Sequence, residues 1–201
     1  MGDVVTTIVA DRGYHEALAA AAADPSVRVV VVTGRHGAFA VDEAIDVAAA
    51  GPLHALSVPK PLVAAVNGRC EGDGLIEALL CDIRFTSTDG RFMAPWARLG
   101  RTAPESAAWV LGRVVGVGAA MDMLLSGREL DATEAAVIGL VQDVFEPEEL
   151  LPAVVAYARR LASSTDPDAV AAIKAQAYRA LELGLGDAIA EARTLAERFR
   201  G

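Results

Sequence analysis

The residues best suited to chemistry in this sequence surround a glycine-rich turn, Gly72-Asp73-Gly74. The turn follows the short apolar segment 62–66, which is typical of a buried strand, and leads into an apolar helix that we expect to begin near Gly74. Amides at the amino end of a helix have no partner within the helix, and the helix dipole adds positive potential there. The pattern therefore predicts a turn that stabilises an anion or a developing oxyanion, although an ordinary connection between a strand and a helix has the same pattern.

Two acidic residues are the candidates for proton transfer near this turn. Asp73 is part of the turn, and Glu105 directly follows the irregular stretch 92–104. A carboxylate that reaches the substrate can shuttle a proton, but an acidic residue in the first turn of a helix also stabilises that helix, so both roles stay open for Glu105. An ionised Asp73 would repel an oxyanion at the same turn.

The composition indicates one folded domain with a sizeable core. Hydrophobic residues make up 53% and charged residues 22% of the 201 residues, and the net charge is −9. Such an acidic chain argues against a nucleic-acid partner. We expect no membrane partner, because no run of about 18 uninterrupted apolar residues is present. The N-terminus lacks the basic start and apolar run of a secretory signal, so we expect a cytoplasmic protein.

The cysteines and histidines predict neither a disulfide nor a metal site. Cys70 and Cys81 flank the helix that follows the glycine-rich turn, and a helix of that length holds them too far apart for a disulfide. The three histidines are scattered, without a second histidine or a cysteine at ligand spacing: His15, His36 and His54.

Strand and helix patterns alternate along most of the chain, and the last quarter is helical. This order is typical of an α/β core (1–147) with a C-terminal helical region (148–201), but periodicity does not distinguish a doubly wound sheet from a spiral one. Strands are expected over 3–10, 28–34, 62–66, 83–87 and 139–145. Helices are expected over 14–23, 42–50, 105–115 and 131–138. The helix over 105–115 is expected to continue over 119–126, and the chain from 148 onward is expected to be helical with one break around 163–167.

Four segments in order resemble the enoyl-CoA hydratase/isomerase, or crotonase, family. They cover about residues 24–145: Asp24 to Gly34 followed by Ala38-Phe39; Lys60-Pro61 through Asp82; Phe92 with Pro95 and Leu99-Gly100; and Ser126-Gly127-Arg128 through Leu140-Val141. The resemblance implies an α/β fold, a crotonase-like spiral of ββα units with a C-terminal helical extension. It also implies that these helices pack against other subunits in a homotrimer or hexamer.

The resemblance further implies that the substrate is an acyl-CoA thioester and that two backbone amides stabilise an enolate oxyanion. Carried onto this chain, the two amides belong to Val41 and to Asp73, which follows Gly72. Trp96 either walls the acyl pocket or belongs to the core, and Lys174 would contact coenzyme A phosphates only if its helix reaches that site. Coenzyme A enters as part of the substrate, and no other cofactor is expected.

The chain departs from the family at the positions of the acid and base. Family hydratases use two glutamates, and an ungapped reading places Ile76 and Trp96 at these positions. Glu77 lies one place beyond the first position, where a helix neighbour points about 100° away, so we expect it mainly to stabilise the first turn of the helix. Asp73 also stands where the family has a glycine.

Two main functions remain open from the sequence. One is an acyl-thioester enzyme with altered acid and base residues, and the other is a catalytically degenerate accessory subunit that supports a partner enzyme. A peptidase of the related spiral fold is the third alternative, but Ser57, Ser87 and Ser106 do not lie in recognisable nucleophile settings. The short segment between Val41 and Lys60 predicts an open acyl pocket.

Overall fold

The computed structural model describes residues 4–41, 54–104 and 106–199, and every structural statement below concerns these ranges. The helix expected over 42–50 and the candidate base Glu105 lie outside the described residues. The strands are β1 (Val5–Val9), β2 (Val29–Thr33), β3 (Leu62–Val66), β4 (Arg69–Glu71), β5 (Ile83–Ser87), β6 (Arg91–Met93), β7 (Glu129–Asp131) and β8 (Val144–Phe145). The helices are α1 (Tyr14–Ala23), α3 (His54–Ser57), α4 (Asp73–Leu80), the 3₁₀ helix η1 (Ala97–Leu99), α5 (Ala107–Ser126), α6 (Ala132–Val137), α7 (Pro147–Ser164), α8 (Pro167–Ala180) and α9 (Leu185–Glu197).

The described strands form two sheets that the chain visits in turn. A parallel five-stranded sheet has the order β1-β2-β3-β5-β8, and a three-stranded sheet has the order β4-β6-β7. The chain passes from β3 to β4, through α4, and back to β5 and β6, so each strand pair contributes one strand to each sheet. This repeated ββα unit is the predicted spiral, and it places the turn before α4 at the carboxyl edge of the parallel sheet.

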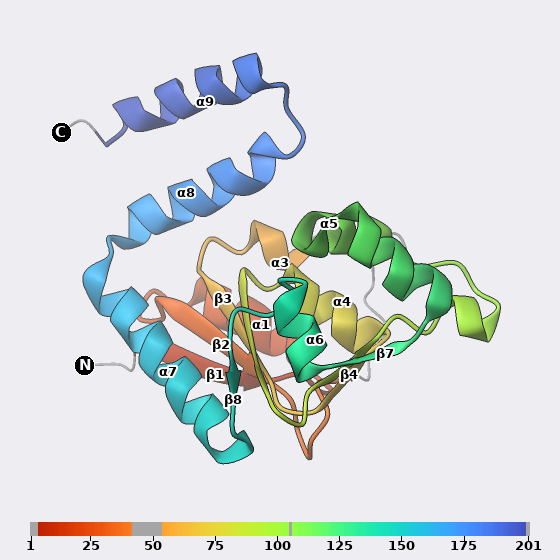
Figure 1. Ribbon diagram of the computed structural model, residues 1–201. Coiled ribbons are helices and arrows are strands. Elements are labelled where there is room, and N and C mark those ends of the chain that lie inside the picture. The colour runs from red at the N-terminus through yellow and green to blue at the C-terminus, as the bar shows by residue number, and fades with distance from the viewer. Residues whose placement is uncertain (1–3, 42–53, 105, 200–201) are drawn as a thin grey trace.

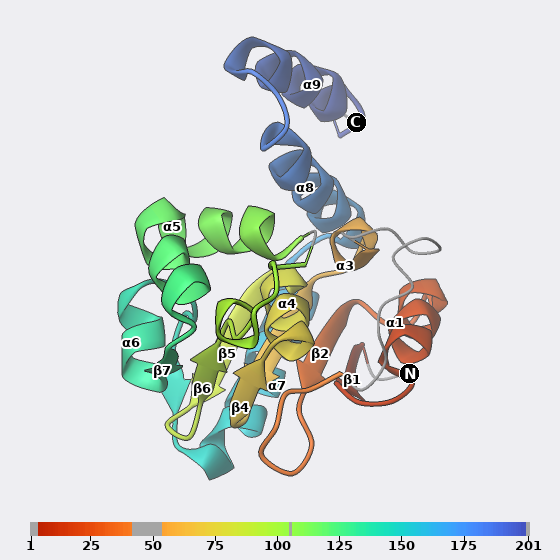
Figure 2. The ribbon, with the colours of Figure 1, turned by 90° about the vertical axis from the view of Figure 1, so that its right-hand side faces the viewer.

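Both faces of the five-stranded sheet are buried, which explains the uninterrupted apolar character of its strands. In β2, Val30 and Val32 pack in the cluster that contains α1 and α4, whereas Val29 and Val31 pack in the cluster that contains α7. Figure 2 shows α4 in front of this sheet and α7 behind it. The buried stripe of α7 follows the helical repeat and consists of Leu150, Val154, Ala158 and Ala162.

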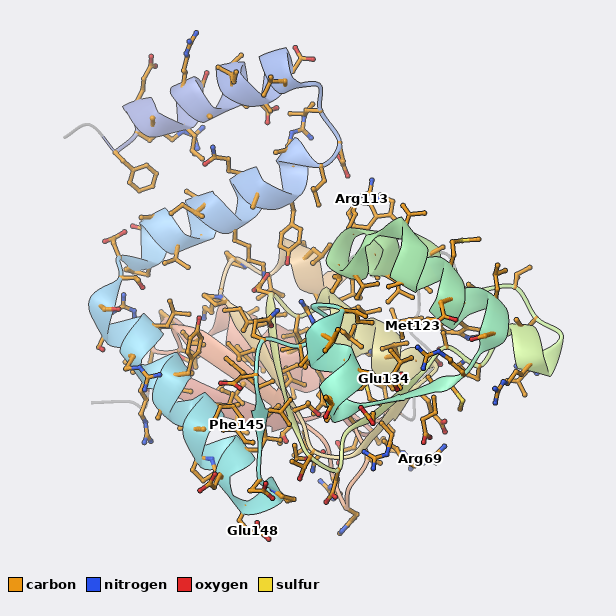
Figure 3. All side chains as sticks on the ribbon, viewed as in Figure 1. Arg69, Arg113, Met123, Glu134, Phe145 and Glu148 are labelled. Carbon is orange, nitrogen blue, oxygen red and sulfur yellow. The ribbon has the colours of Figure 1, made fainter. Side chains whose placement is uncertain are left out.

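Aromatic contacts extend the α7 layer to the edge strand β8. Phe145 lies between β8 and the nearby helix in Figure 3, and its ring meets that of Phe85 edge-on with centroids 6.0 Å apart. The Phe85 ring also meets the ring of Tyr157 of α7 edge-on at 5.2 Å. α7 therefore closes the back of the sheet from β2 to β8.

The short strands are the main features that the sequence pattern did not predict. β4 falls in the predicted loop before the glycine-rich turn, and β6 falls in the stretch assigned as turn and irregular chain. β7 also was not expected. Each has three residues, too few for a period-2 pattern, and each exists because it pairs with a neighbour distant in sequence: Cys70 opposes Phe92, which opposes Leu130.

Several helix and strand boundaries also differ from the expectation. The helix expected to close at Gly116 does break there, because φ 77° and ψ 159° are not helical, so α5 consists of two helical segments joined at a kink. The strand expected over 139–145 shortens to β8, because the amide of Leu140 bonds back to the carbonyl of Ala135. A second break at 181–184 separates α8 from α9. The start of α6 is as predicted, with Asp131 and Glu134 forming a reciprocal capping box.

Among the described helices, α5 alone is long and apolar enough by length and composition to cross a membrane. Core helices of water-soluble proteins meet the same test, and α5 carries Arg113 and Asp122. Only part of α5 is buried in this chain, with Val117 and Leu125 among its exposed apolar residues. α5 is therefore a helix whose apolar surface is only partly covered by the rest of the described chain.

The C-terminal helices leave the body, and a polar contact fastens α8 to it. In Figure 1, α8 and α9 extend away from the sheets toward the C-terminus. Lys174 is the buried residue of α8, only 7% exposed, and its Nζ lies 2.8 Å from Oδ2 of Asp82, which follows α4. The hydroxyl of Tyr178 donates to Oδ1 of Asp82 at 2.7 Å, and the amide of Leu62 donates to Oδ2 at 2.7 Å. We call Asp82, Lys174 and Tyr178 the Asp82 node.

We predict that the Asp82 node contributes strongly to stability. Asp82→Ala leaves the buried ammonium of Lys174 without its carboxylate, so the free energy of unfolding should fall by about 3–5 kcal/mol in urea denaturation. The free energy of unfolding should fall clearly less in the double variant Asp82→Asn/Lys174→Met, because no unpaired charge stays buried.

The matched control is Glu191→Gln, which breaks the exposed pair between Arg179 and Glu191. Its cost should stay within about 0.2–1 kcal/mol. Equal losses for Asp82→Ala and the control would contradict a structural role for the node.

Candidate active site

The candidate site is built where the loop after β2 meets the turn before α4, and glycines permit the contact. A Cβ atom on Gly74 would lie 2.1 Å from the carbonyl oxygen of Phe39, and one on Gly68 would lie 1.9 Å from that of Gly37. No side chain larger than hydrogen fits these distances without a backbone shift. The two backbones therefore pack directly on one another.

Hydrogen bonds fix the same two segments in register. The amide of Arg69 donates to the carbonyl of Gly37 at 2.9 Å, and the amide of Phe39 donates to the carbonyl of Arg69 at 2.7 Å. The side-chain amide of Asn67 donates to the carbonyl of Gly34 at 3.0 Å. Phe39 is fully buried beneath this junction, which anchors the loop in the core.

The two predicted oxyanion donors flank this junction. Val41 is two residues beyond Phe39, and Asp73 directly precedes Gly74. Asp73 is the first residue of α4, and its side chain is exposed. Within the described ranges, no hydrogen bond uses the amide of Val41 or Asp73. Gly72 has φ 56° and ψ −124°, a positive-φ conformation that suits glycine and turns the chain into α4.

The other sequence candidates lie at different distances from the junction. Trp96 is buried in the main core cluster, which also includes Phe39 and Ile76. Glu105 lies outside the described residues, so its predicted roles stay predictions. Lys174 is buried in the Asp82 node, where its Nζ also donates to the carbonyl of Lys60 at 3.1 Å. The ammonium of Lys174 is thus engaged within the chain, and its suggested contact with coenzyme A phosphates stays a prediction.

Glu77 is the titratable residue whose environment the sequence analysis underestimated. It is only 2% exposed, on the face of α4 that packs against α1, and its Oε1 lies 3.8 Å from Nε2 of His15. Burial raises the pKa of Glu77 to about 7, the Tyr14 hydroxyl lowers it in part, and the Asp73 carboxylate adds to the increase. One available signal was that Glu77 is the lone charged residue in the otherwise apolar run 75–80.

The thiols near the site are not reactive groups. Cys70 and Cys81 are free and buried, and burial raises the pKa of both thiols far above neutral pH. Among the residues that the structure describes, no cluster of three His, Cys, Asp or Glu side chains has the arrangement of a metal site.

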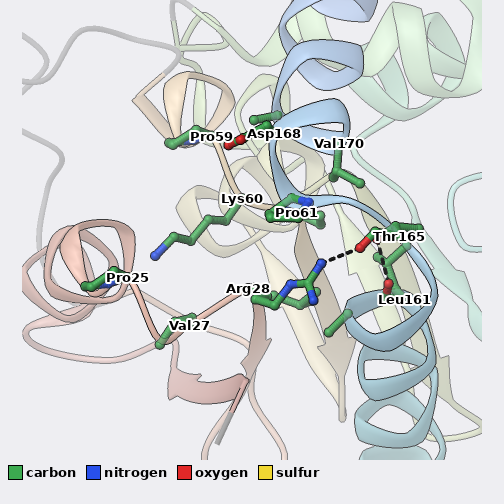
Figure 4. Close-up of a pocket in the computed structure, with 14 residues that line it drawn as sticks. Pro25, Val27, Arg28, Pro59, Lys60, Pro61, Leu161, Thr165, Asp168 and Val170 are labelled. Atoms are coloured by element: carbon green, nitrogen blue, oxygen red, sulfur yellow. Dashed lines mark hydrogen bonds between the residues drawn. The ribbon is translucent and has the colours of Figure 1, made fainter. Parts of the chain in front are cut away.

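A separate groove lies where the chain enters β2 and β3, beside the connection of α7 to α8 (Figure 4). It has a volume of about 380 Å³, and two cations line it. Arg28 donates to the carbonyl of Thr165, and Lys60 donates to the carbonyls of Ala21 and Asp24. Because these cations bind the carbonyl ends of helices and loops, the groove is better explained as a junction between elements than as the predicted site.

Comparison with known proteins gives a family and a set of relatives. Residues 12–200 match the family described as enoyl-CoA hydratase/isomerase. A probable enoyl-CoA hydratase of Rhizobium meliloti is 34% identical over 197 residues, with 92% of this chain and 76% of that protein covered. A probable enoyl-CoA hydratase of Mycobacterium tuberculosis is 36% identical over 177 residues, with 76% of this chain covered. The chain spans only 61% of the length of this second relative.

Solved structures agree with this assignment. A probable enoyl-CoA hydratase/isomerase from Mycobacterium abscessus superposes with a TM-score of 0.88 at 27% identity, covering 100% of this chain and 89% of that chain. An enoyl-CoA hydratase from Mycobacterium marinum superposes with a TM-score of 0.77 at 37% identity, covering 87% of this chain and 92% of that chain. The predicted α/β spiral with C-terminal helices is confirmed.

We predict that the junction tolerates no side chain at Gly74. Gly74→Ala places a Cβ against the carbonyl of Phe39, so the loop must move, and the free energy of unfolding should fall by about 1–3 kcal/mol in urea denaturation. Gly112→Ala is the matched control in α5, where a Cβ meets nothing within 4 Å, and it should gain about 0.5–1 kcal/mol. A neutral effect at Gly74 would show that the backbones do not touch.

Proposed function

The chain belongs to the enoyl-CoA hydratase/isomerase family and has its crotonase fold, and from this premise we propose that it acts on an acyl-CoA thioester. In this proposal the amides of Val41 and Asp73 bind the thioester oxygen and stabilise the negative charge that develops on it as an enolate forms. Coenzyme A enters as part of the substrate, and the reaction needs no further cofactor.

The observation that carries this proposal is the backbone contact between Gly74 and Phe39. The contact holds two chain segments at one place, and each segment has an amide without a partner among the described residues. Donors fixed in advance cost no reorganisation when charge develops, and one such donor is commonly worth about 3 kcal/mol of transition-state stabilisation. The dipole of α4 acts in the same direction at this end of the helix.

The acid and base of this enzyme differ from those of the family hydratases in our proposal. Ile76 and Trp96, which the ungapped reading places at the positions of the two glutamates, are buried apolar residues that cannot transfer a proton. Proton shuttling by one carboxylate at Glu105 or Asp73 would suit an isomerase, a decarboxylase, or a hydratase of altered mechanism. The exposed carboxylate of Asp73 would weaken the oxyanion site less than a buried one, because water screens it.

A catalytically degenerate accessory subunit is the second candidate. The apolar residues Ile76 and Trp96 favour it, because a chain that has lost both catalytic glutamates can keep the fold and the contacts of its relatives. In either case we propose a homotrimer or hexamer, since the protruding C-terminal helices expose large apolar side chains to solvent. These are Ile173, Leu181, Leu185, Ile189 and Phe199.

Calorimetric titration with several acyl-CoAs, with free coenzyme A as the reference, tests the proposed substrate class. We expect acyl-CoAs to bind more tightly than coenzyme A alone, because the thioester oxygen meets the two amides. Crotonyl-CoA hydration measured in parallel should be slow or absent. Glu105→Gln should abolish turnover and keep acyl-CoA affinity if Glu105 carries the proton.

Each of these three measurements could contradict a different part of the proposal. No binding of any acyl-CoA would contradict the enzyme and favour the accessory subunit. Hydration at the rate of an ordinary hydratase would contradict the altered acid and base. Unchanged turnover of Glu105→Gln would remove Glu105 from the mechanism.

The oligomeric state has its own measurement. Light scattering at micromolar protein concentration should give the mass of three or six chains, because burial of the exposed apolar residues of α8 and α9 favours association. A monomer at that concentration would show that these helices do not serve assembly.

A further inference from the structure

The interface between α1 and α4 contains a cluster of titratable side chains outside the oxyanion junction. Oε1 of Glu77 is buried, lies 3.8 Å from Nε2 of His15, and accepts no hydrogen bond from a described residue. The rings of Tyr14 and His15 meet edge-on with centroids 4.9 Å apart. Tyr14 is fully buried, whereas His15 is partly exposed and links the cluster to solvent.

An apolar side chain would fill this place at lower cost. A buried, incompletely hydrogen-bonded carboxylate costs free energy in general, and taking up a proton removes the part of this cost that comes from burying the charge. The flanking helix residues Ile76 and Ala78 are buried and apolar, so α4 does not need a carboxyl group here to pack. A carboxyl kept in such a place titrates more readily than a surface carboxyl when the pH changes near neutrality.

Burial keeps two of the groups around Glu77, a hydroxyl and a thiol, uncharged in the same pH range. Burial raises the pKa of the Tyr14 hydroxyl well above its usual value, and burial does the same for the thiol of Cys81 one turn along α4. Asp73, one turn toward the amino end, adds negative charge that favours the protonated form of Glu77. Of the described neighbours, His15 is therefore the residue that can share a proton with Glu77.

We propose that Glu77, His15 and Tyr14 form a proton-operated clamp that packs α1 firmly against α4 when Glu77 carries a proton and loosens when it ionises. The clamp acts on the helix that begins at the oxyanion turn. Asp73 and Glu77 lie on the same side of that helix, four residues apart, so ionisation of Glu77 adds a second negative charge near the place where an oxyanion develops. A regulated site of this kind, which rests on the proposed function, would bind acyl-CoA better below neutral pH than above it.

The direction of the effect on stability follows from proton linkage. The pKa of Glu77 is about 7 in the folded chain and 4.5 in the absence of the fold, so the folded state holds more protons between these values. Stability therefore falls as pH rises through this window, and the folding equilibrium constant should decrease on the order of a hundredfold between pH 5 and 8 from this group.

The test compares the wild type with Glu77→Gln, which keeps the shape and cannot ionise. Urea denaturation between pH 5 and 8.5 should show that the free energy of unfolding falls with rising pH in the wild type. It should change less with pH in the variant. Hydrogen exchange, corrected for its intrinsic pH dependence, should show α1 losing protection relative to β3 as pH rises in the wild type. Glu16→Gln, an exposed change on α1, is the control and should follow the wild type. Parallel pH profiles for the wild type and Glu77→Gln, or unchanged α1 protection, would overturn the clamp.

Acyl-CoA titration at pH 6 and pH 8 separates the clamp from the proposed function. The wild type should bind several-fold more weakly at pH 8, and Glu77→Gln should bind equally at both values. Equal pH dependence in the two proteins would overturn regulation of the site. Absence of acyl-CoA binding at both pH values would contradict the proposed function. The pH dependence of the free energy of unfolding would still test whether the clamp exists.

Discussion

The direct packing of two backbones is the constraint on which the rest of the structure depends. Gly74 lies against the carbonyl of Phe39 and Gly68 lies against that of Gly37, so the loop after β2 and the turn before α4 occupy one small volume. The parallel sheet brings the carboxyl ends of β2 and β3 to the same edge, and the absence of side chains at the glycines lets the segments after them touch. This contact brings together the segments that carry Val41 and Asp73 through backbone atoms alone.

Helix α4 combines opposing electrostatic demands. Its amino end has the positive end of a dipole and the amide of Asp73, which has no hydrogen-bond partner among the described residues, while Asp73 and Glu77 place carboxyl groups along the same side. Exposure to water weakens the repulsion from Asp73, and protonation removes the charge of Glu77. Anion binding at this end of the helix, as proposed above, therefore depends on solvent screening of Asp73 and on the protonation of Glu77.

The sequence predicted the long, repetitive parts of the fold and missed the parts that tertiary contacts create. The bounds of α1 and β3 and the core of β2 follow from local apolar runs and stop signals, and the structure has them as expected. The strand β4 has only three residues and exists through its pairing with β6, which no local pattern reports. The turn before α4 was predictable from its glycines, but the burial of Glu77 was not, because it depends on a helix that is some 60 residues away in the chain.

The way α8 is fastened affects how the C-terminal helices can move. An apolar contact lets two helices slide over one another by small steps at little cost, whereas a desolvated ion pair is satisfied only in one orientation. Lys174 and Tyr178 both meet the carboxylate of Asp82, which also accepts the amide at the start of β3. α8 is thus expected to have two discrete states, seated or released, with few intermediate positions. Lys174 also donates to the carbonyl of Ala55 in α3, and α3 contacts α4. Release of α8 would therefore break a hydrogen bond to a helix that packs beside α4.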